Sequence, residues 1–555
     1  MNIADPCGGD EDTEPRREKG AKMSMDRKPH IIIFNPDEMR WDAMGHMGNP
    51  AAVTPFLDRF AATEAVSFSR AYCQNPVCVP SRCSFLTGLY PHVRGHRTMN
   101  YLLRPGETTL FRELMDAGYY VWMNDRNDLL AGQIPGWCES HATEIYYSGQ
   151  EKPGPGPLHP PAPGGPDRYS HFEGQLGVDE RGLCRNSDDE VVDAAIRRIR
   201  TRRKDQPLCL FLGLFYPHPP YQIEEPYFSA VDRGKLPERI RPENCSGKSE
   251  IMTAIRKNAG LDGWNEAQWD ELRAVYLGMC GKIDAQFARL VAALREEGIY
   301  DDSAIFFLSD HGDFTGDYGL PEKAQNTFED CLTRVPLLVK PPRGIPLDPG
   351  ISGALTELVD FHATVLDLAG AESSQPHFGR SLLPVLANRE TANRPFVCCE
   401  GGRLPGEVHC DEYHGPDGRE ASPRDVYWPK KKAQSDPVAH SKGIMLREKR
   451  FKYVSRLLGR DELYDMETDP GETTNLIDLP EMRDTVAEMR FSLMKWLQAT
   501  GDIVPYEADR RFTREMLFTK GRAVAGEGHD AEILAKIDAG ADIGELMRFC
   551  ASLGG

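Results

Sequence analysis

Four short runs of apolar residues recur along this chain, and each ends in polar residues. The runs cover residues 28–35, 119–123, 208–215 and 304–308. Continuous apolar runs of this kind are typical of strands that are buried on both faces. Stretches with helical spacing of apolar residues lie between them, so the pattern predicts an α/β fold with a large doubly wound mixed sheet flanked by helices.

Capping residues and glycines mark where the intervening helices begin and end. Thr54 followed by Pro55 predicts one helix start, and Ser187 with Glu190 forms a capping-box pattern before another. Further helices are predicted over residues 108–117, over residues 266–297, and from a cap at Asp360 to Gly370.

Beyond residue 385 the pattern changes to short strand-like segments and one helical stretch. They lie at residues 443–447, 451–455 and 462–465, with helical spacing over 481–499. This predicts a smaller α+β domain with an antiparallel sheet. We therefore divide the chain into a catalytic α/β domain over 26–385, an α+β subdomain over 386–500 and a helical extension over 501–555.

Both ends of the chain differ from the globular part. Residues 1–25 are polar and charged and lack the apolar segment of a secretory signal, so we expect a disordered leader and a cytoplasmic location. Residues 531–540 and 543–549 have amphipathic spacing but are too short to be stable helices alone. We expect them to pack on the body of the protein or on a neighbouring subunit, and we favour a subunit contact in a homo-oligomer.

Residues 75–88 carry the strongest candidate chemistry. Pro80 fixes its own backbone and restricts the residue before it to extended geometry, and Ser81 is placed to cap the turn that follows. Arg82 adds a fork of donors beside a helix N-terminus, where anions are favoured. These residues place the thiol of Cys78 just before a helix and beside an anion site.

Two other interpretations of Cys78 stay open at this point. The thiol could be a buried structural cysteine, because free cysteine often behaves as a small hydrophobe. Cys73, Cys78 and Cys83 could form a metal cluster, although their spacing does not match the close pairs of zinc sites.

Candidate metal ligands follow two of the predicted strands. Asp37 and Glu38 come after the first strand, and Asp310 and His311 come after the last. Open α/β sheets bind their ligands at the carboxyl ends of strands, and carboxylates with an imidazole suit a divalent metal. A capping or solvated acidic turn is the alternative for Asp37 and Glu38.

The pattern Cys78-x-Pro80-Ser81-Arg82, followed by Leu86-Thr87-Gly88, resembles the signature of the sulfatase family. The resemblance extends over roughly residues 28–500, with the motifs in the expected order. It implies an alkaline-phosphatase-like fold and oxidation of Cys78 to formylglycine by a formylglycine-generating enzyme. In that family the hydrate of this aldehyde is the nucleophile.

The resemblance also implies a metal site. Asp37, Glu38, Asp310 and His311 stand at the family's ligand positions. Ca²⁺ is the expected ion, with Mn²⁺ and Zn²⁺ as alternatives because one ligand is an imidazole. The family most often has Asp-Asp where this chain has Asp37-Glu38, so the match is complete at Asp37 only.

Three basic residues take catalytic positions of the family. Arg82 belongs to the signature, and Lys323 stands where the family has a lysine that contacts the transferred group. His218 corresponds to a histidine on the leaving-group side. A structural loop histidine is the alternative for His218.

The loop after the second predicted strand departs from the family. Sulfatases usually have Gly-Lys-x-His there, and alignment by the strand puts Arg126 at the lysine position and Asp128 at the histidine position. Arginine for lysine keeps the charge and adds bidentate reach, whereas aspartate for histidine changes the chemistry. We expect both residues to bind the substrate, and a surface loop is the alternative.

Composition narrows the choice of partners. The 555 residues carry a formal net charge of −19, which argues against binding to nucleic acid or to an anionic membrane. A small anionic ester would therefore be attracted by a local basic site. The 14 cysteines are scattered and do not form a disulfide framework, which favours a reducing compartment.

We therefore predict a sulfuric ester hydrolase, and Ser81 in the signature favours sulfate esters. A phosphonate monoester or phosphodiester hydrolase is the alternative on the same fold. A catalytically inactive binding protein is the alternative of another class, because a fold does not fix a function.

Overall fold

The computed structural model describes residues 27–151, 154–180, 182, 184–407, 422–506 and 511–554. The predicted leader over residues 1–25 lies outside the described residues. The chain forms two compact units, the first ending at Asp502 and the second beginning at Ile503. None of the helices described is both long and apolar enough to cross a membrane.

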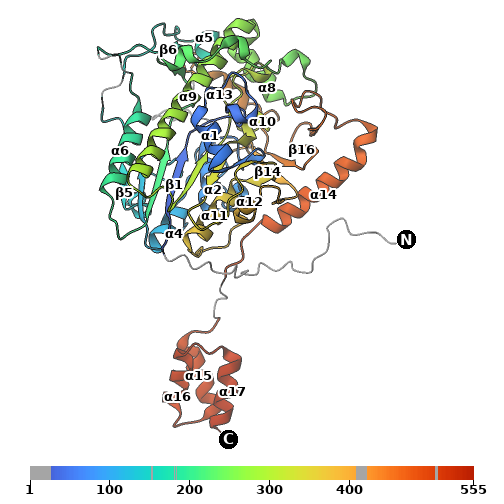
Figure 1. The fold of residues 1–555 in the computed structure, drawn as a ribbon. Coiled ribbons are helices and arrows are strands. Elements are labelled where there is room, and N and C mark those ends of the chain that lie inside the picture. The colour runs from blue at the N-terminus through green and yellow to red at the C-terminus, as the bar shows by residue number, and fades with distance from the viewer. Residues whose placement is uncertain are drawn as a thin grey trace. The chain divides into compact units, whose positions relative to one another are not determined.

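An eight-stranded mixed sheet forms the centre of the first unit (Figure 1). Its central strands β9, β1, β7 and β4 run parallel to one another, whereas β11 is antiparallel to both of its neighbours. The sheet confirms the predicted α/β fold. In spatial order its strands are β12 (Gly350–Ser352), β2 (Val66–Phe68), β11 (Leu337–Lys340), β9 (Ser303–Leu308), β1 (His30–Asn35), β7 (Leu208–Gly213), β4 (Tyr120–Asn124) and β5 (Glu144–Tyr146).

Helices lie on both faces of the large sheet (Figure 1), and alternate residues of β1 pack against these two different layers. Ile31 and Ile33 belong to one hydrophobic core and Ile32 and Phe34 to the other, because successive side chains of a strand point to opposite faces. The first core includes residues of α2 (Cys78–Thr87), α4 (Leu110–Asp116) and α11 (Val359–Ala369), and the second includes residues of α1 (Pro55–Thr63), α6 (Ser187–Thr201) and α9 (Glu266–Glu296).

A separate four-stranded antiparallel sheet follows in the same unit, as predicted. Its strands lie side by side in chain order, and α14 (Arg483–Thr500) packs on it through Met489, Leu493 and Trp496. The predicted boundary at residue 385 falls inside α12 (Leu383–Ala387). The strands are β14 (Val397–Gly401), β15 (Gly443–Arg447), β16 (Phe451–Arg456) and β17 (Glu462–Asp465).

Shorter elements connect these layers. Two small sheets are formed by β10, β3 and β13 and by β6 and β8. The remaining elements of the first unit are β3 (Ala71–Tyr72), α3 (Pro91–Arg94), α5 (Pro166–Tyr169), β6 (Phe172–Gln175), β8 (Tyr221–Ile223), α7 (Tyr227–Ala230), α8 (Glu250–Ala259), α10 (Asp330–Thr333), β10 (Arg334–Val335), β13 (Thr356–Glu357) and α13 (Trp428–Gln434), with short 3₁₀ turns between them.

The predicted N-terminal caps of α6 and α11 are wrong. The capping box of α6 is formed by Asn186 and Asp189, one residue earlier than predicted. Asp360 lies inside the first turn of α11 and does not cap it. Its carboxylate pairs instead with the guanidinium of Arg394, so a tertiary partner has taken the place of the local one.

The second unit is a bundle of three helices with its own apolar core. The two helices predicted from amphipathic spacing are present as α16 (Asp530–Asp538) and α17 (Ile543–Leu553). The sequence analysis missed α15 (Arg514–Ala525), whose Leu517 packs with Ile533 and Leu546. The three helices therefore cover one another's apolar faces, which removes the reason for expecting a subunit contact. The homo-oligomer stays a prediction.

Candidate active site

The predicted site residues converge because four parallel strands end at the same edge of the sheet. The loops after β1, β4, β7 and β9 all leave from that edge. They carry Asp37 and Glu38, Arg126 and Asp128, His218, and Asp310 and His311, respectively.

Two glycines let these loops approach closely. A side-chain carbon on Gly213, at the end of β7, would lie 2.2 Å from the carbonyl oxygen of Arg126. A side-chain carbon on Gly312 would lie 2.0 Å from the carbonyl oxygen of Cys331. The glycine in the sequence Ser309-Asp-His-Gly312 is therefore required by packing and not by chemistry.

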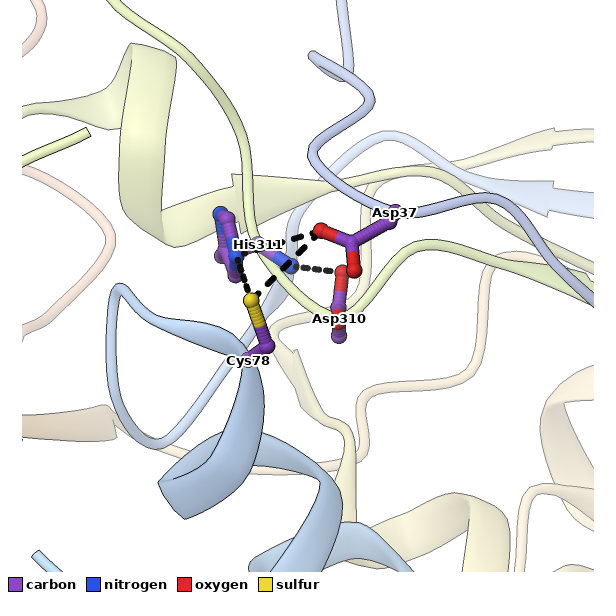
Figure 2. A group of neighbouring side chains, drawn as sticks. All are labelled: Asp37, Cys78, Asp310 and His311. Atoms are coloured by element: carbon purple, nitrogen blue, oxygen red, sulfur yellow. Dashed lines mark hydrogen bonds and ion pairs between the residues drawn. The ribbon is translucent and has the colours of Figure 1, made fainter. Parts of the chain in front are cut away.

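Cys78 is the first residue of α2, so the prediction that it lies just before the helix is wrong. Val79, which precedes Pro80 and was predicted to be extended, also lies inside the helix, and the extended residue is Val77. The thiol of Cys78 is buried and faces the metal-type ligands, since Sγ lies 3.3 Å from Nε2 of His311 and 3.6 Å from Oδ1 of Asp37 (Figure 2).

Among the described residues, Cys73, Cys78 and Cys83 do not form a metal cluster. The thiols of Cys73 and Cys83 face the backbone carbonyls of Leu332 and Leu129 instead.

Ser81 and Arg82 fasten α2 to the end of β9. The hydroxyl of Ser81 donates to the carbonyl of Asp310 at 2.6 Å, so the predicted capping role of Ser81 is wrong. Nε of Arg82 donates to Oδ2 of Asp310, and Nη2 donates to Oδ2 of Asp37, both at 2.7 Å. Burial would lower the pKa of Arg82, but Asp310, Asp128 and Asp37 together hold it above its usual value.

Asp37 is shared by two arginines and the thiol. Nη2 of Arg126 donates to Oδ2 of Asp37 at 2.7 Å, beside the bond from Arg82. Burial would raise the pKa of Asp37, but Arg126 and Arg82 hold it well below its usual range. Oδ2 is thus occupied by guanidinium groups, and Oδ1 is the oxygen that faces Cys78 and His311.

The loop of Arg126 and Asp128 lies at the site, as the alignment by β4 predicted. Oδ2 of Asp128 is 3.3 Å from Nη1 of Arg82 and 3.9 Å from Nε of Arg126. The Asp128 side chain is 30% exposed, and its φ of 50° is in the left-handed region. A carboxylate therefore stands at the solvent side of the two arginines.

Glu38 turns away from Asp310 and towards the other predicted catalytic residues. Its Oε2 lies 2.7 Å from Nζ of Lys323 and 3.6 Å from Nε2 of His218. Nδ1 of His218 lies 2.7 Å from the carbonyl oxygen of Pro219, which directs Nε2 to Glu38. The backbone N–H of Glu38, not its carboxylate, contacts Asp310, at 3.2 Å.

Among the residues that the structure describes, the side chains that could hold a metal form two groups that share Asp37. Ligand atoms of Asp37, Cys78, Asp310 and His311 all lie within 4.8 Å of one another, and so do those of Asp37, Glu38 and His218. Burial lowers the pKa of His311 even though Asp310 raises it, which favours the neutral imidazole that metals bind. Nδ1 of His311 lies 2.9 Å from the carbonyl oxygen of Gly312, leaving Nε2 directed at the group.

Comparison with known families decides the relationship of this chain. The profile of the family described as Sulfatase matches residues 29–371. The chain belongs to the sulfatase family. Within the sulfatase family, curated relatives are similar over most of the sequence. An arylsulfatase from Clostridium perfringens is 26% identical over 85% of this chain and 95% of its own length.

Other relatives are more diverse. Arylsulfatase K of Danio rerio is 22% identical over 86% of this chain and 89% of its own length. A multifunctional alkaline phosphatase superfamily protein from Trinickia caryophylli is 25% identical over 86% of this chain and 96% of its own length. The similarity thus includes proteins whose names point beyond sulfate esters.

Solved structures confirm the fold. A phosphonate monoester hydrolase of Agrobacterium radiobacter has a TM-score of 0.68 at 19% identity and covers 86% of this chain and 97% of its own. A 2-O GAG sulfatase has a TM-score of 0.63 at 21% identity and covers 85% of this chain and 93% of its own. Both share the alkaline-phosphatase-like architecture of the sulfatase family.

Sequence analysis missed three charged residues of this sulfatase-family site. Asp313 accepts from the hydroxyl of Tyr221 at 2.8 Å, and Glu322 pairs with Lys323 at 2.8 Å and also with Lys430. Asp313 and Glu322 stand beside predicted residues in the chain and could have been found there. Lys430 begins the run Lys430-Lys-Lys432, which has the appearance of a solvated surface.

The charges of the described site residues do not balance. Six carboxylates face four cations, which leaves two negative charges that a divalent cation would neutralise. The carboxylates are Asp37, Glu38, Asp128, Asp310, Asp313 and Glu322, and the cations are Arg82, Arg126, Lys323 and Lys430.

Proposed function

We propose that this protein is a sulfuric ester hydrolase whose nucleophile is residue 78 after oxidation of Cys78 to formylglycine. The observation that carries the proposal is the position of Cys78. Its Sγ is buried at the first residue of α2, 3.3 Å from His311 and 3.6 Å from Asp37. A structural cysteine in an apolar core would have no reason to face a carboxylate and an imidazole.

The surrounding residues suit a singly charged ester. Arg82 and Arg126 present guanidinium groups beside residue 78, and Lys323 presents an ammonium group from the Glu38 side. Fixed donors of this kind stabilise the charge that develops on the transferred group, because they need no reorganisation during the reaction. His218 and Lys323 are the groups that we expect to assist the departing alcohol.

Asp37, Asp310 and His311 are the residues that we propose as metal ligands. Two oxygens, one imidazole nitrogen and a deficit of two positive charges fit a divalent cation. Ca²⁺ is the ion that we propose, with Mn²⁺ and Zn²⁺ as competitors because of His311. A bound ion would supply Lewis acidity at the position of residue 78. Glu38 points to Lys323, so we assign it to the positioning of that lysine.

Phosphonate monoester or phosphodiester hydrolysis is the second candidate. A phosphonate monoester hydrolase shares the fold over 86% of this chain. Such esters carry a single negative charge, as sulfate esters do, so the arginines and Asp128 do not separate the two reactions by charge.

A matched panel tests the proposal. One sample is assayed with an aryl sulfate, an aryl phosphonate monoester and an aryl phosphodiester of the same phenol, and its metal content is measured. We expect the highest kcat/KM for the sulfate. Peptide mass spectrometry of active enzyme from its native host should find formylglycine at position 78, and active enzyme with only unmodified cysteine there would contradict the proposal.

A further inference from the structure

Lys430 reaches the active site from an unusually long connection. β14 and β15 are antiparallel neighbours, and Gly401 of one pairs with Gly443 of the other. Strands paired in this way are usually joined by about two to five residues, whereas here residues 402–442 intervene. Long connections within compact units are usually functional. Part of the described portion of this one forms α13.

Two other segments hold α13 in place. Nδ2 of Asn258, in α8, donates to the carbonyl of Pro429 at 3.2 Å. The ring of Tyr169, in α5, stacks on Trp428 with a centroid distance of 6.0 Å, and its hydroxyl donates to the carbonyl of Pro423. Contacts with α8 and with α5 therefore hold α13, which gives its side chains a defined position.

The later part of the same connection is bonded to the loop that carries Lys323. Nε2 of His440 lies 3.0 Å from Oε1 of Gln325. Nδ2 of Asn326 donates to the carbonyl of Ala439 at 2.7 Å. The two lysines, Lys323 and Lys430, thus come from segments that hold each other.

One carboxylate serves both of these lysines. Glu322 pairs with Lys323 at 2.8 Å and with Lys430, whose side chain is only 12% exposed. Lys323 has a second carboxylate, Glu38, at 2.7 Å. Within the described residues, Glu322 is the one carboxylate that pairs with Lys430, whose Nζ also lies 5.7 Å from the centre of the Tyr427 ring. Its ammonium group therefore has donors left for another acceptor.

The surroundings of Lys430 favour an additional anion. Burial lowers the pKa of its ammonium group to about 7, although Glu38, Asp313 and the Cys78 thiol raise it. A buried ammonium group, whose charge is disfavoured by loss of solvent, is stabilised by any anion that enters beside it.

We propose that Lys430 contacts the substrate and stabilises the negative charge that builds on the departing alcohol oxygen. The assignment rests on the proposed function. A hydroxyl oxygen of residue 78 forms a bond to sulfur and gives up its proton to water, while the bond between sulfur and the ester oxygen breaks. The electron pair stays on the ester oxygen, to which Lys430 donates a hydrogen bond, and water supplies the proton of the released alcohol.

The position of Lys430 distinguishes it from the two arginines. Arg82 and Arg126 are bonded to Asp37, which faces the nucleophile, whereas Lys430 joins Lys323 on the Glu38 side with His218. Displacement at the transferred atom is in line, so the leaving oxygen stands opposite the nucleophile. Because the guanidinium groups of Arg82 and Arg126 are engaged by Asp37, the lysines are the cations available to the leaving oxygen.

A series of aryl sulfates that differ in the acidity of the phenol tests this role. Lys430→Met should lower kcat/KM by about 10- to 100-fold for the least acidic phenol, since a hydrogen bond to a charged group is lost. The loss should shrink to less than about threefold for a nitrophenol, whose oxygen needs little stabilisation. In Lys430→Met, kcat/KM should therefore depend more steeply on the pKa of the phenol than it does in the parent enzyme.

Lys432→Met is the matched control. Lys432 is on the same helix, is exposed and lies over the Trp428 ring, so its replacement should leave the leaving-group dependence unchanged. The thermal midpoint of each variant is measured to confirm that it is folded. A folded Lys430→Met enzyme with no loss, or with an equal loss for every phenol, would overturn the assignment.

The same phenols esterified to phenylphosphonic acid separate the two proposals. If the parent enzyme cleaves the phosphonates but not the sulfates, the proposed function is wrong, and the role of Lys430 is decided by the slope of the phosphonate series. If the parent cleaves the sulfates and Lys430→Met has the parental slope, only the role of Lys430 is wrong. A parent that cleaves neither series overturns both.

Discussion

Nη2 of Arg82 donates a hydrogen bond to Oδ2 of Asp37 at 2.7 Å, and both side chains are completely buried. Nε of the same guanidinium group holds Asp310 at the same distance. The first and last loops of the site are thus joined through one residue of α2. A lysine would not be equivalent, because its three donors rotate about a single nitrogen, whereas the guanidinium group holds Nε and Nη2 in one rigid plane.

We predict that Arg82→Met destabilises the larger unit and abolishes activity. Removing one partner of a buried ion pair leaves an uncompensated charge and costs about 3–5 kcal/mol. The thermal midpoint, measured by scanning calorimetry, should fall by several degrees. Arg203→Met is the control, since Arg203 is 68% exposed and an ion pair on the surface contributes little to stability. Equal midpoints for the two variants would show that the carboxylates have other partners.

Asp310→Ala should lose metal and activity together. Asp310 belongs to the group of ligand atoms that lie within 4.8 Å of one another, and the remaining ligands would be too few to retain the ion. Metal per protein, measured by elemental mass spectrometry, should fall to near zero. Glu38→Gln should keep the metal, because the Glu38 carboxylate is bonded to Lys323. Full occupancy in Asp310→Ala would show that Asp310 is not a ligand.

Asp188 gives a pH-dependent prediction. Its carboxylate accepts from the backbone N–H groups of Phe215 and Tyr216, at 2.7 and 2.8 Å, and so positions the loop of His218. Burial raises its pKa to about 6, although those two bonds lower it. A raised pKa means that the protonated form favours folding, so this contribution is present below about pH 4 and is lost as pH rises through 6.

Asp188→Asn should therefore flatten the change in thermal midpoint between pH 4 and pH 7. The amide keeps one acceptor oxygen but directs its NH₂ group at the second backbone N–H, so one hydrogen bond is lost. The loop that carries His218 should then shift, and kcat/KM should fall by about tenfold. KM and kcat are measured separately, and a sulfate of an acidic phenol should be the less affected substrate. An unchanged pH dependence of the midpoint would contradict the assigned titration.

The site residues could be predicted from the sequence wherever a reactive or metal-binding side chain directly follows a predicted strand. Asp37, Arg126, His218 and Asp310 each follow an apolar run, and parallel pairing of those runs brings them together. Lys430 could not be found in this way, because it lies on a short helix in a long connection and its charged neighbours are typical of a surface.

Local signals failed where a distant partner was stronger. Ser81 has the position of a cap, yet its hydroxyl donates to the carbonyl of Asp310, which is remote in the sequence. Asp360 likewise pairs with Arg394. In the second unit, α15 was missed because its apolar residues, including Leu517, become recognisable as a helix face only when Ile533 and Leu546 are placed against them.

The second unit should be dispensable for folding of the first. Its three helices form a separate apolar core through Leu517, Ile533, Leu546 and Cys550. A chain that ends at Asp502 should therefore keep the thermal midpoint and the kcat/KM of the full chain. Light scattering on both chains tests the predicted homo-oligomer. A lower midpoint in the shortened chain would show that the second unit contributes to the first, and an unchanged oligomeric mass would exclude the helices as the subunit contact.

The last prediction concerns the pair that departs from the family. Asp128 stands 3.3 Å from Arg82 and 3.9 Å from Arg126, at the exposed side of both. A carboxylate there repels a dianionic phosphate monoester more than a singly charged sulfate ester. Arg126→Ala should lower kcat/KM for the sulfate by about 10- to 100-fold, because a charged hydrogen bond is worth about 1.5–3 kcal/mol.

Asp128→Asn should have a different effect from Arg126→Ala. It removes the negative charge and keeps the shape, so kcat/KM for an aryl phosphate should rise relative to that for the aryl sulfate of the same phenol. Asp125→Asn, in the same loop and bonded to Ser148 at 2.9 Å, is the control and should leave this ratio unchanged. If Asp128→Asn also leaves the ratio unchanged, charge at this position does not select the substrate, and the preference must come from the metal and the groups around residue 78.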